Sequence, residues 1–372
     1  MQKKLIVVAL AAAFALPVTA HADNGNFTFY GVADLSYDFV NTGDGVTTAN
    51  GATAVSGTSK RVVSSNVSKF GFKGSEDLGE GLSANWQIEQ QIDIDAAAKS
   101  TFASRNTFVN LKSQKLGTVL FGIHDTPYKL AARKLDMFGD NIGDNRALIG
   151  APKGNSSKQG FELRPTDIFM YTSPTFAGFN VAVATVNLKE ANTKNTDKRD
   201  SITSLAVTYD AAPFFGSVAH ESHKLESNVT TTQGQDESAS RLGFGFKPEG
   251  KPFEVTAVYE KTTDNLGALG ANVNGHSAAY LGAKYMMGSN AVKLGYAKAG
   301  TLSSVTDSGA SQVTVGYDHG LSKNTKLYAL YSKITNGKGI NYGFSQNSGA
   351  ANTTSGFGTS PSVVSLGVKH AF

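Results

Sequence analysis

The sequence predicts an all-β protein, a 16-stranded antiparallel β-barrel that crosses a membrane. Three observations support this fold class: rows of alternating apolar residues that end in aromatic side chains, regular turn signals between the rows, and a last strand that closes on an aromatic residue. The chain has 372 residues, of which 40% are hydrophobic, and a mean hydropathy of -0.19. This is too polar for a bundle of membrane helices, whereas a barrel needs only half of each strand to be apolar.

The first residues predict a secretory signal peptide at residues 1–22. Two lysines precede an apolar run from Leu5 to Leu16, and small residues suited to a cleavage site follow it. The alternative, a membrane anchor, is disfavoured because a helix of twelve residues extends only ~18 Å, short of the ~30 Å hydrocarbon core. We therefore expect a mature barrel domain at residues 23–372.

The first predicted strand shows the pattern that recurs along the chain. Between Phe27 and Phe39, apolar and polar residues alternate, and aromatic residues stand at both ends of the apolar row. The same alternation, each time ending in Tyr, recurs at 253–259, 279–285, 292–296, 313–317 and 327–331. An aromatic residue at the end of an apolar row is typical of a membrane–water interface, whereas a water-soluble β-sandwich gives no reason for it.

Turn signals predict the number of strands. Seven short turns occur at Glu76–Glu80, Ser113–Leu116, Pro174–Ala177, Asp210–Phe214, Pro248–Pro252, Met287–Asn290 and Gly320–Thr325. Eight longer polar stretches occur at Asn41–Lys60, Asp95–Thr101, Asp125–Leu163, Glu190–Arg199, Lys224–Ser238, Thr263–Gly275, Gly300–Gly309 and Asn336–Ser360. Fifteen connections join sixteen strands, with both termini on the short-turn side. A barrel of this size leaves an aqueous channel.

The last predicted strand covers Pro361–Phe372. Val364, Leu366, Val368 and Phe372 share one parity, so we expect them to face lipid, with Phe372 in the aromatic girdle at the interface.

Composition and motifs exclude several classes of function. The chain has no Cys, which rules out disulfides and thiolate chemistry, and its 34 basic and 30 acidic residues leave a net charge of about +2 once the two leader lysines are removed. This balance does not fit a nucleic-acid binder. No nucleophile elbow, phosphate loop or dinucleotide fingerprint occurs. His220 and His223 would point to opposite faces of a strand, so we expect no metal site and no cofactor.

Five segments resemble the trimeric general porins of Gram-negative outer membranes, the Gram-negative porin family. Ser68–Gly79 resembles their second strand and first turn, where family members commonly have Arg at the places of Lys69 and Lys73. The other segments are Asn26–Asp34, Arg105–Leu120, Tyr171–Phe179 and Gly367–Phe372, which resemble the first strand, the fourth strand with its turn, a later turn and the terminal strand. The resemblance implies a homotrimer in the outer membrane that admits ions and small hydrophilic solutes by passive diffusion. It also implies that Phe372 is an assembly signal.

The resemblance further implies which residues form the pore constriction. Outward Phe70 and Phe72 would place Lys69 and Lys73 in the lumen, and outward Phe108 would place Arg105 there. Arg164 occupies the place of another pore-wall Arg, and the longest connection, Asp125–Leu163, corresponds to a loop folded into the barrel. That loop carries three acidic residues, Asp136, Asp140 and Asp144.

Basic wall residues opposite acidic loop residues would create a transverse field and a weak anion preference, unless Glu89 and Asp93 cancel the positive charge. The sequence leaves alternatives open. The aspartates could form a solvated loop, or a calcium site that their spacing fits poorly, and Lys69 and Arg105 could be rim residues. The barrel itself could be an outer-membrane enzyme or a surface adhesin.

Overall fold

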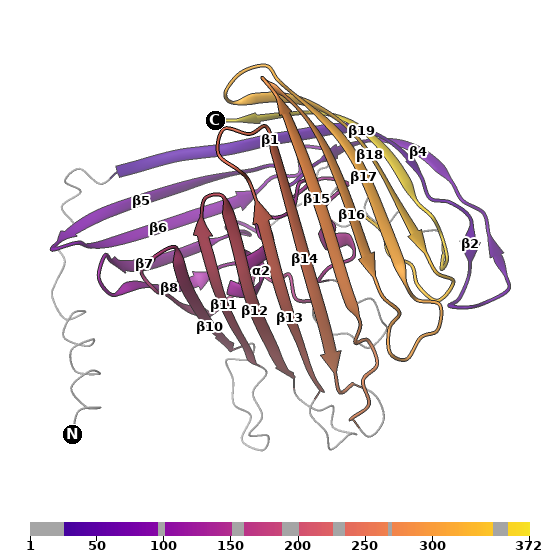
Figure 1. Cartoon of the computed structure of the whole chain (residues 1–372), viewed down its shortest axis with the longest axis horizontal. Helices are drawn as coiled ribbons and strands as arrows, with labels where there is room; N and C mark the ends of the chain where they lie inside the picture. The colour runs from indigo at the N-terminus through magenta and orange to yellow at the C-terminus, as the bar shows by residue number, and fades with distance from the viewer. Residues whose placement is uncertain are drawn as a thin grey trace.

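The computed structural model describes residues 26–95, 101–150, 160–187, 201–225, 235–266, 270–344 and 356–372. In this part of the chain one antiparallel sheet closes on itself, because its first strand pairs with its last (Figure 1). The sheet contains 17 strand segments, two of which, β4 and β5, pair one after the other along β1 and together make one crossing. The predicted barrel of sixteen strands is therefore confirmed. The predicted signal peptide, residues 1–22, lies outside the described residues and stays a prediction.

The strands follow one another around the barrel in chain order. They are β1 (Asn26–Asn41), β4 (Ser59–Ser65), β5 (Lys69–Gly79), β6 (Leu82–Gln91), β7 (Thr107–Ser113), β8 (Gly117–Ile123), β9 (Ile168–Thr172), β10 (Phe179–Asn187), β11 (Ser201–Ala211), β12 (Phe214–Leu225), β13 (Gln235–Phe246), β14 (Phe253–Asp264), β15 (Ser277–Met287), β16 (Asn290–Ala299), β17 (Ala310–Gly320), β18 (Thr325–Asn336) and β19 (Ser362–Ala371). Each of the seven predicted turns and eight predicted long connections falls at a junction between consecutive strands. Several of them overlap the strand ends, most of all Glu76–Glu80, whose first four residues belong to β5. A small hairpin, β2 (Gly45–Val46) with β3 (Ala54–Val55), lies in the first loop, and the third loop contains helix α2 (Pro127–Arg133) and the 3-10 turn η1 (Asn145–Ala147).

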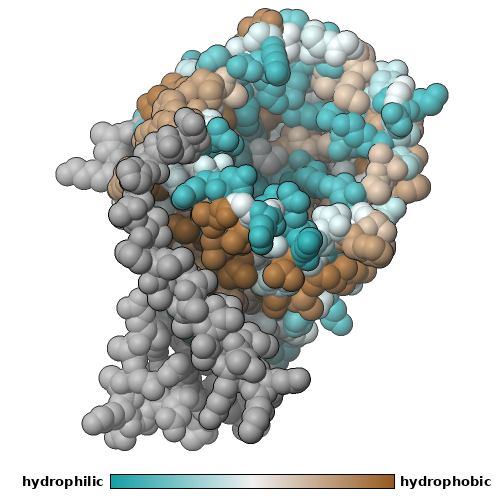
Figure 2. Space-filling model, turned by 90° about the vertical axis from the view of Figure 1, so that its left-hand side faces the viewer, coloured by the Kyte–Doolittle hydropathy of each residue, from teal (hydrophilic) through white to brown (hydrophobic). Residues whose placement is uncertain are grey.

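The two walls of the barrel differ in polarity, as the alternation predicts. On β19, Val364, Leu366 and Val368 are 40%, 50% and 41% exposed, whereas the alternate residues Val363 and Ser365 are buried. Figure 2 shows a hollow lined by hydrophilic residues, with hydrophobic residues along the outer rim. The outer wall therefore suits lipid and the inner wall suits water. Among the described residues no helix is long and apolar enough to span a membrane.

The second crossing is interrupted by a β-bulge just before Lys69. Three residues, 66–68, face two residues of β1, and Val67 adopts a positive φ of 57°. The hydroxyl of Ser68 accepts a hydrogen bond from the backbone N–H of Asp34 at 2.9 Å, in place of a ladder bond. A bulge changes the direction of the side chains that follow it, and Lys69 is the first residue after this one.

One predicted orientation is wrong. Phe108 does not face lipid; it packs with a cluster of buried inner-wall residues that includes Leu120 and Met170, and its ring lies 5.1 Å from that of His124. The outward residue is Val109, which is 59% exposed. Leu163, at the end of the third loop, packs against the same buried cluster as Phe108, so an apolar residue is stable on the inner wall here.

The described part of the third loop, residues 124–150 and 160–167, folds into the barrel and lies against the inner wall (Figure 1). Its apolar residues Leu135 and Phe138 are 1% and 2% exposed. They fit because the wall there is built of glycine: a Cβ on Gly243 would lie 2.6 Å from Leu135, and one on Gly316 would lie 2.7 Å from Phe138. Hydrogen bonds complete the contact, since Thr256 donates to the Leu135 carbonyl at 2.7 Å. The glycines of the inner wall therefore leave room for the loop to pack inside the barrel.

Candidate functional site

A buried ion cluster fastens the third loop to the wall. Arg241 of β13 contacts Glu260 of β14 at 2.5 Å and Glu162 of the loop at 2.6 Å. The hydroxyl of Tyr128 in α2 donates to Glu260 at 2.6 Å, and the backbone N–H of Gly150 donates to the same carboxylate at 2.8 Å. Arg241 and Glu260 are 3% and 0% exposed. Two loop segments thus attach to the same pair of wall residues, which fixes how far the loop reaches into the lumen.

The acidic residues of the loop are held by arginines of the same loop. Asp140 accepts hydrogen bonds from Arg146 at 2.8 Å and from Arg133 at 3.3 Å, and Asp144 pairs with the Nε and one terminal nitrogen of Arg146. Burial acts to raise the pKa of Asp140, but Arg133 and Arg146, helped by Arg105 of the facing wall, outweigh it and hold the pKa well below its usual range. Asp140 is therefore ionised and fixed in direction.

Asp136 has a different environment from the other two aspartates. Its two oxygens accept backbone hydrogen bonds from Phe138 at 2.9 Å and from Asn145 at 3.0 Å, and it has no ion pair within the described residues. Burial, together with the nearby charge of Asp144, raises the pKa of Asp136 well above its usual range. Asp136 therefore shapes the loop and contributes less negative charge than Asp140.

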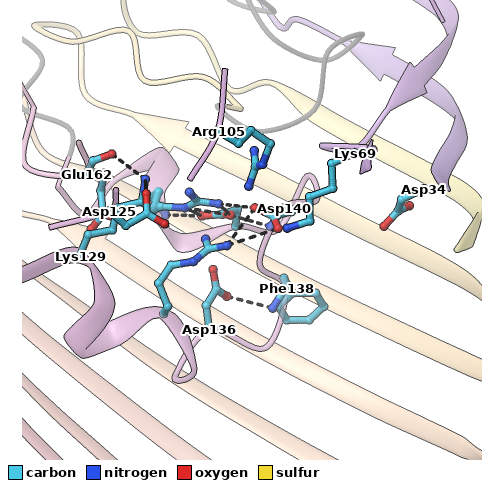
Figure 3. A network of polar contacts seen from close by, with 12 residues as sticks. Asp34, Lys69, Arg105, Asp125, Lys129, Asp136, Phe138, Asp140 and Glu162 are labelled. Atoms are coloured by element: carbon cyan, nitrogen blue, oxygen red, sulfur yellow. Dashed lines mark hydrogen bonds and ion pairs between the residues drawn. The ribbon is translucent and has the colours of Figure 1, made fainter. Parts of the chain in front are cut away.

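On the facing wall, two predicted basic residues meet at one carboxylate. The carboxylate of Glu89 on β6 accepts hydrogen bonds from the side chain of Arg105 at 2.7 Å and from the hydroxyl of Tyr30 at 3.0 Å. It also lies 3.6 Å from the ammonium of Lys69. Arg105 lies just before β7, which begins at Thr107, so the strand alternation does not fix its direction. Its side chain is buried and faces inward, towards Glu89. Figure 3 shows Arg105 and Lys69 close to Asp140 of the loop. The wall and the loop thus present opposite charges to each other.

The other two predicted basic residues, Lys73 and Arg164, make no described ion pair with Glu89. Lys73 is exposed, and its ammonium lies 5.4 Å from the centre of the Tyr30 ring. Arg164 pairs with Asp125 at 3.1 Å, and Asp125 also pairs with Lys129 at 2.9 Å. Burial acts to raise the pKa of Asp125, but these two cations outweigh it and lower the pKa to about 2. Arg164 therefore lies at the base of the loop rather than on a strand.

Comparison with known families identifies the channel. The model of one family, described as Gram-negative porin, matches residues 8–339. The chain belongs to the Gram-negative porin family. Porins are outer-membrane channels for the passive diffusion of small solutes, and this porin, with its closed barrel and hydrophilic lumen, is one of them. Neither alternative, a barrel enzyme or a surface adhesin, receives support.

Relatives and solved structures agree with this assignment over nearly the whole chain. The porin is similar to outer membrane porin protein 32 of Delftia acidovorans, with 25% identity over 380 residues and 100% coverage of both chains. It is 28% identical to the major outer membrane protein P.IB of Neisseria meningitidis serogroup B over 349 residues, which covers 91% of this chain and 95% of that one. Its fold is similar to that of an anion-selective porin from Comamonas acidovorans, with a TM-score of 0.73, 23% identity and coverage of 94% and 100%.

The charged segments of this porin are evident from its sequence, whereas the partners of these charges are not. Arg133 and Arg146 were not predicted, although Arg146 follows Asp144 by two residues and a basic residue so close to an aspartate is a usable signal. Glu89, which the sequence indicates as a residue that opposes the positive charge of the wall, contacts Lys69 and Arg105. Asp93, the second acidic residue considered for this role, accepts a hydrogen bond from Gln91 instead.

Phe372 lies at the seam where the barrel closes. Its backbone N–H donates to the Gly31 carbonyl at 3.0 Å, and its carbonyl accepts from the Gly31 N–H at 2.9 Å. Its ring lies 5.7 Å from that of Phe29 and stacks on His370 at 6.2 Å. The ring also covers Gly31, where an added Cβ would come within 2.3 Å of it. Phe372 thus joins the first and last strands through both its backbone and its ring.

Proposed function

We propose that the third loop and the wall of β5 to β7 form the constriction of the channel and that a transverse field crosses it. The observation that carries this proposal is the opposition of Arg105 and Lys69 on the wall to Asp140 on the loop (Figure 3). Low-dielectric walls focus such a field, which orients dipolar solutes and disfavours apolar ones. Arg133 and Arg146 keep the carboxylate of Asp140 in a fixed position, so the field has a fixed direction.

The charge count at the constriction favours anions weakly. On the wall, Lys69 and Arg105 share Glu89, and Lys73 makes no ion pair among the described residues. At the base of the loop, Arg164 and Lys129 share Asp125. On the loop itself, two arginines face three aspartates, of which Asp136 has a raised pKa. Positive charges therefore exceed negative ones by a small margin, which supports a weak anion preference.

Ion selectivity tests this proposal. Replacing Arg105 with Glu changes the wall by two unit charges, which at about 8 Å from a passing ion is worth roughly 1 kcal/mol in water. The change disfavours anions and favours cations by this amount each, so the anion-to-cation permeability ratio should fall by at most roughly thirtyfold. We expect Arg105→Glu to shift the ratio towards cations and Asp140→Lys to shift it towards anions. The zero-current potential of the purified porin in a planar bilayer under a salt gradient measures both shifts.

The matched control is Lys115→Glu, which makes the same charge change in the exposed turn between β7 and β8. This variant should keep the parent selectivity. The shifts should also shrink between 0.1 M and 1 M salt, because the Debye length falls from ~10 Å to ~3 Å. Unchanged selectivity and conductance in both Arg105→Glu and Asp140→Lys would show that these residues do not line the narrow section.

We also propose that the porin is a homotrimer. A solved structure of similar fold, OmpT of Vibrio cholerae, is described as a trimer form. In this chain the outer wall at β1, β5 and β6 carries a cluster of aromatic rings that is available for subunit contact: Phe27, Phe29, Phe70, Phe72 and Trp86. Chemical crosslinking and sedimentation in mild detergent should give three chains per particle. A monomer in both measurements would contradict the trimer and leave the barrel unaffected.

A further inference from the structure

A pocket lies between the third loop and the inner wall, where β11 to β14 meet their short turns. Its volume is about 310 Å³, close to the lower limit of about 300 Å³ for pockets that bind small organic molecules. We call it the turn-side pocket, and its lining includes Lys134, Leu135, Asp210, Phe215, Lys247 and Glu254. Neither Lys69 nor Arg105 is among its lining residues, so the pocket is separate from the proposed constriction.

The turn-side pocket faces the lumen and has an apolar lining. Leu135 belongs to the loop inside the barrel, and Phe215 has the parity of Ala219, which packs in one buried cluster with Phe161 of the same loop. Gly245 of β13 leaves the space open, because a Cβ added there would lie 3.2 Å from Leu135 and 3.4 Å from Phe215. The inner wall is therefore recessed at this point, with Leu135 and Phe215 at the border of the recess.

Lys134 of the third loop brings a positive charge to this apolar lining. Its ammonium lies 3.7 Å from the centre of the Phe215 ring and 2.5 Å from the carboxylate of Asp210 on β11. The side chains of Lys134 and Asp210 are 46% and 65% exposed, and ion pairs as exposed as this one contribute little to stability. The carboxylate of a ligand can therefore replace that of Asp210 beside Lys134.

A second lysine of the pocket has no anionic partner. Lys247 is exposed, and within the part of the chain that the structure describes its side chain makes no ion pair and no hydrogen bond. Its backbone N–H donates to the Pro213 carbonyl at 2.8 Å, which fixes its backbone at the edge of the pocket. The other acidic residue of the pocket, Glu254, pairs with Lys284 at 3.1 Å. Three lysines thus accompany two carboxylates, which leaves one positive charge in excess.

We propose that the turn-side pocket binds small aromatic carboxylates. The ring of such a ligand packs against Leu135 and the edge of Phe215, and its carboxylate pairs with Lys247 and, in place of Asp210, with Lys134. The excess positive charge disfavours amines, and the apolar recess favours a ring over a small inorganic anion.

The pocket gives these solutes a second site beyond the constriction, because the short turns of outer-membrane barrels face the periplasm. Weak binding at such a site assists passage, since conduction requires that a solute be held only briefly. The proposal requires only that the third loop lies inside the barrel, and it does not depend on the transverse field.

Benzoate tests the pocket, with benzyl alcohol, acetate and benzylamine as probes that each lack its ring or its negative charge. Their binding to the detergent-solubilised porin would be measured by ligand-detected NMR titration. Benzoate should bind saturably, and each of the other three compounds should bind at least roughly tenfold more weakly, because each loses either the charge-assisted hydrogen bonds or the buried ring. Equal binding of benzoate and acetate would overturn the proposal.

Three variants test the roles of the pocket residues. Lys247→Gln should weaken benzoate binding roughly tenfold and leave benzyl alcohol binding unchanged, whereas Lys247→Arg should retain the benzoate affinity. Asp210→Asn should strengthen benzoate binding by up to roughly fivefold, because it removes the carboxylate that competes for Lys134. A gain of affinity cannot come from a damaged fold. Unchanged benzoate binding in Lys247→Gln, or weaker binding in Asp210→Asn, would contradict the assignment.

The matched control is Lys251→Gln, which removes an exposed lysine of the adjoining turn that does not line the pocket, and it should bind benzoate like the parent. Arg105→Glu separates this site from the constriction, and it should retain saturable benzoate binding. If Arg105→Glu abolishes that binding and Lys247→Gln does not, benzoate binds in the constriction and the turn-side pocket is not its site. The ion selectivity of the parent does not enter this test, so its failure is distinct from that of the proposed constriction.

Discussion

Replacing Arg241 with Met is expected to release the third loop from the wall and to raise the conductance of the channel. Arg241 is the only cation paired with Glu260 and Glu162 among their described ion pairs, so its loss leaves the buried carboxylate of Glu260 and the partly buried carboxylate of Glu162 without an ion-pair partner. Removing one member of a buried ion pair costs about 3–5 kcal/mol. The barrel strands keep their ladders, so we expect the loop to detach while the barrel persists. Single-channel conductance and protease cleavage within residues 124–167 measure the release.

Two further variants show whether unpaired charge is the cause. Adding Glu162→Gln and Glu260→Gln to Arg241→Met removes both orphan carboxylates, so the loop should become resistant to protease again, at least in part. Arg61→Met removes an exposed arginine of β4 and should leave conductance unchanged. If Arg241→Met has the conductance and protease resistance of the parent, the ion cluster does not hold the loop.

The fold was predictable because its signals are local. A turn and an alternating row each depend on a few neighbouring residues, so the strand count and the lipid-facing parity of Phe70, Phe72 and Val364 could be found from the sequence alone. Phe108 was placed wrongly because its environment is not local. It faces the lumen, where it packs against the same buried cluster as Leu163 of the folded-in loop, so hydrophobicity no longer indicates the lipid side.

The site was predictable only in part because its contacts join distant segments. Charged loop and wall residues could be found as residue types at inward or loop positions. Their partners could not: Tyr128 and Glu260 are 132 residues apart in the chain, and the pairing of Arg105 with Glu89 depends on Arg105 lying before the start of β7. A further signal was present, since Arg241 and Glu260 are charges at inward strand positions, which mark a wall that contacts something other than lipid.

Replacing Phe372 with Asp is expected to lower the amount of assembled barrel in the outer membrane. The ring is half exposed to the lipid side and covers Gly31, and its backbone closes the seam between β1 and β19. Losing the burial of an aromatic ring and adding a carboxylate at the interface costs about 2 kcal/mol, roughly thirtyfold in the equilibrium between inserted and uninserted chain. Outer-membrane fractionation and trypsin resistance measure this loss against the parent.

Three variants separate the role of the ring from that of any interfacial aromatic residue. Phe372→Tyr keeps an aromatic ring and should assemble like the parent. Gly31→Val should lower assembly while leaving residue 372 intact, because its side chain would occupy the place of the ring. Phe253→Asp changes an outward aromatic residue of β14, away from the seam, and should have the smaller effect. If Phe372→Asp reaches the parent's abundance and trypsin resistance, the seam closes without the ring, because the backbone hydrogen bonds with Gly31 suffice.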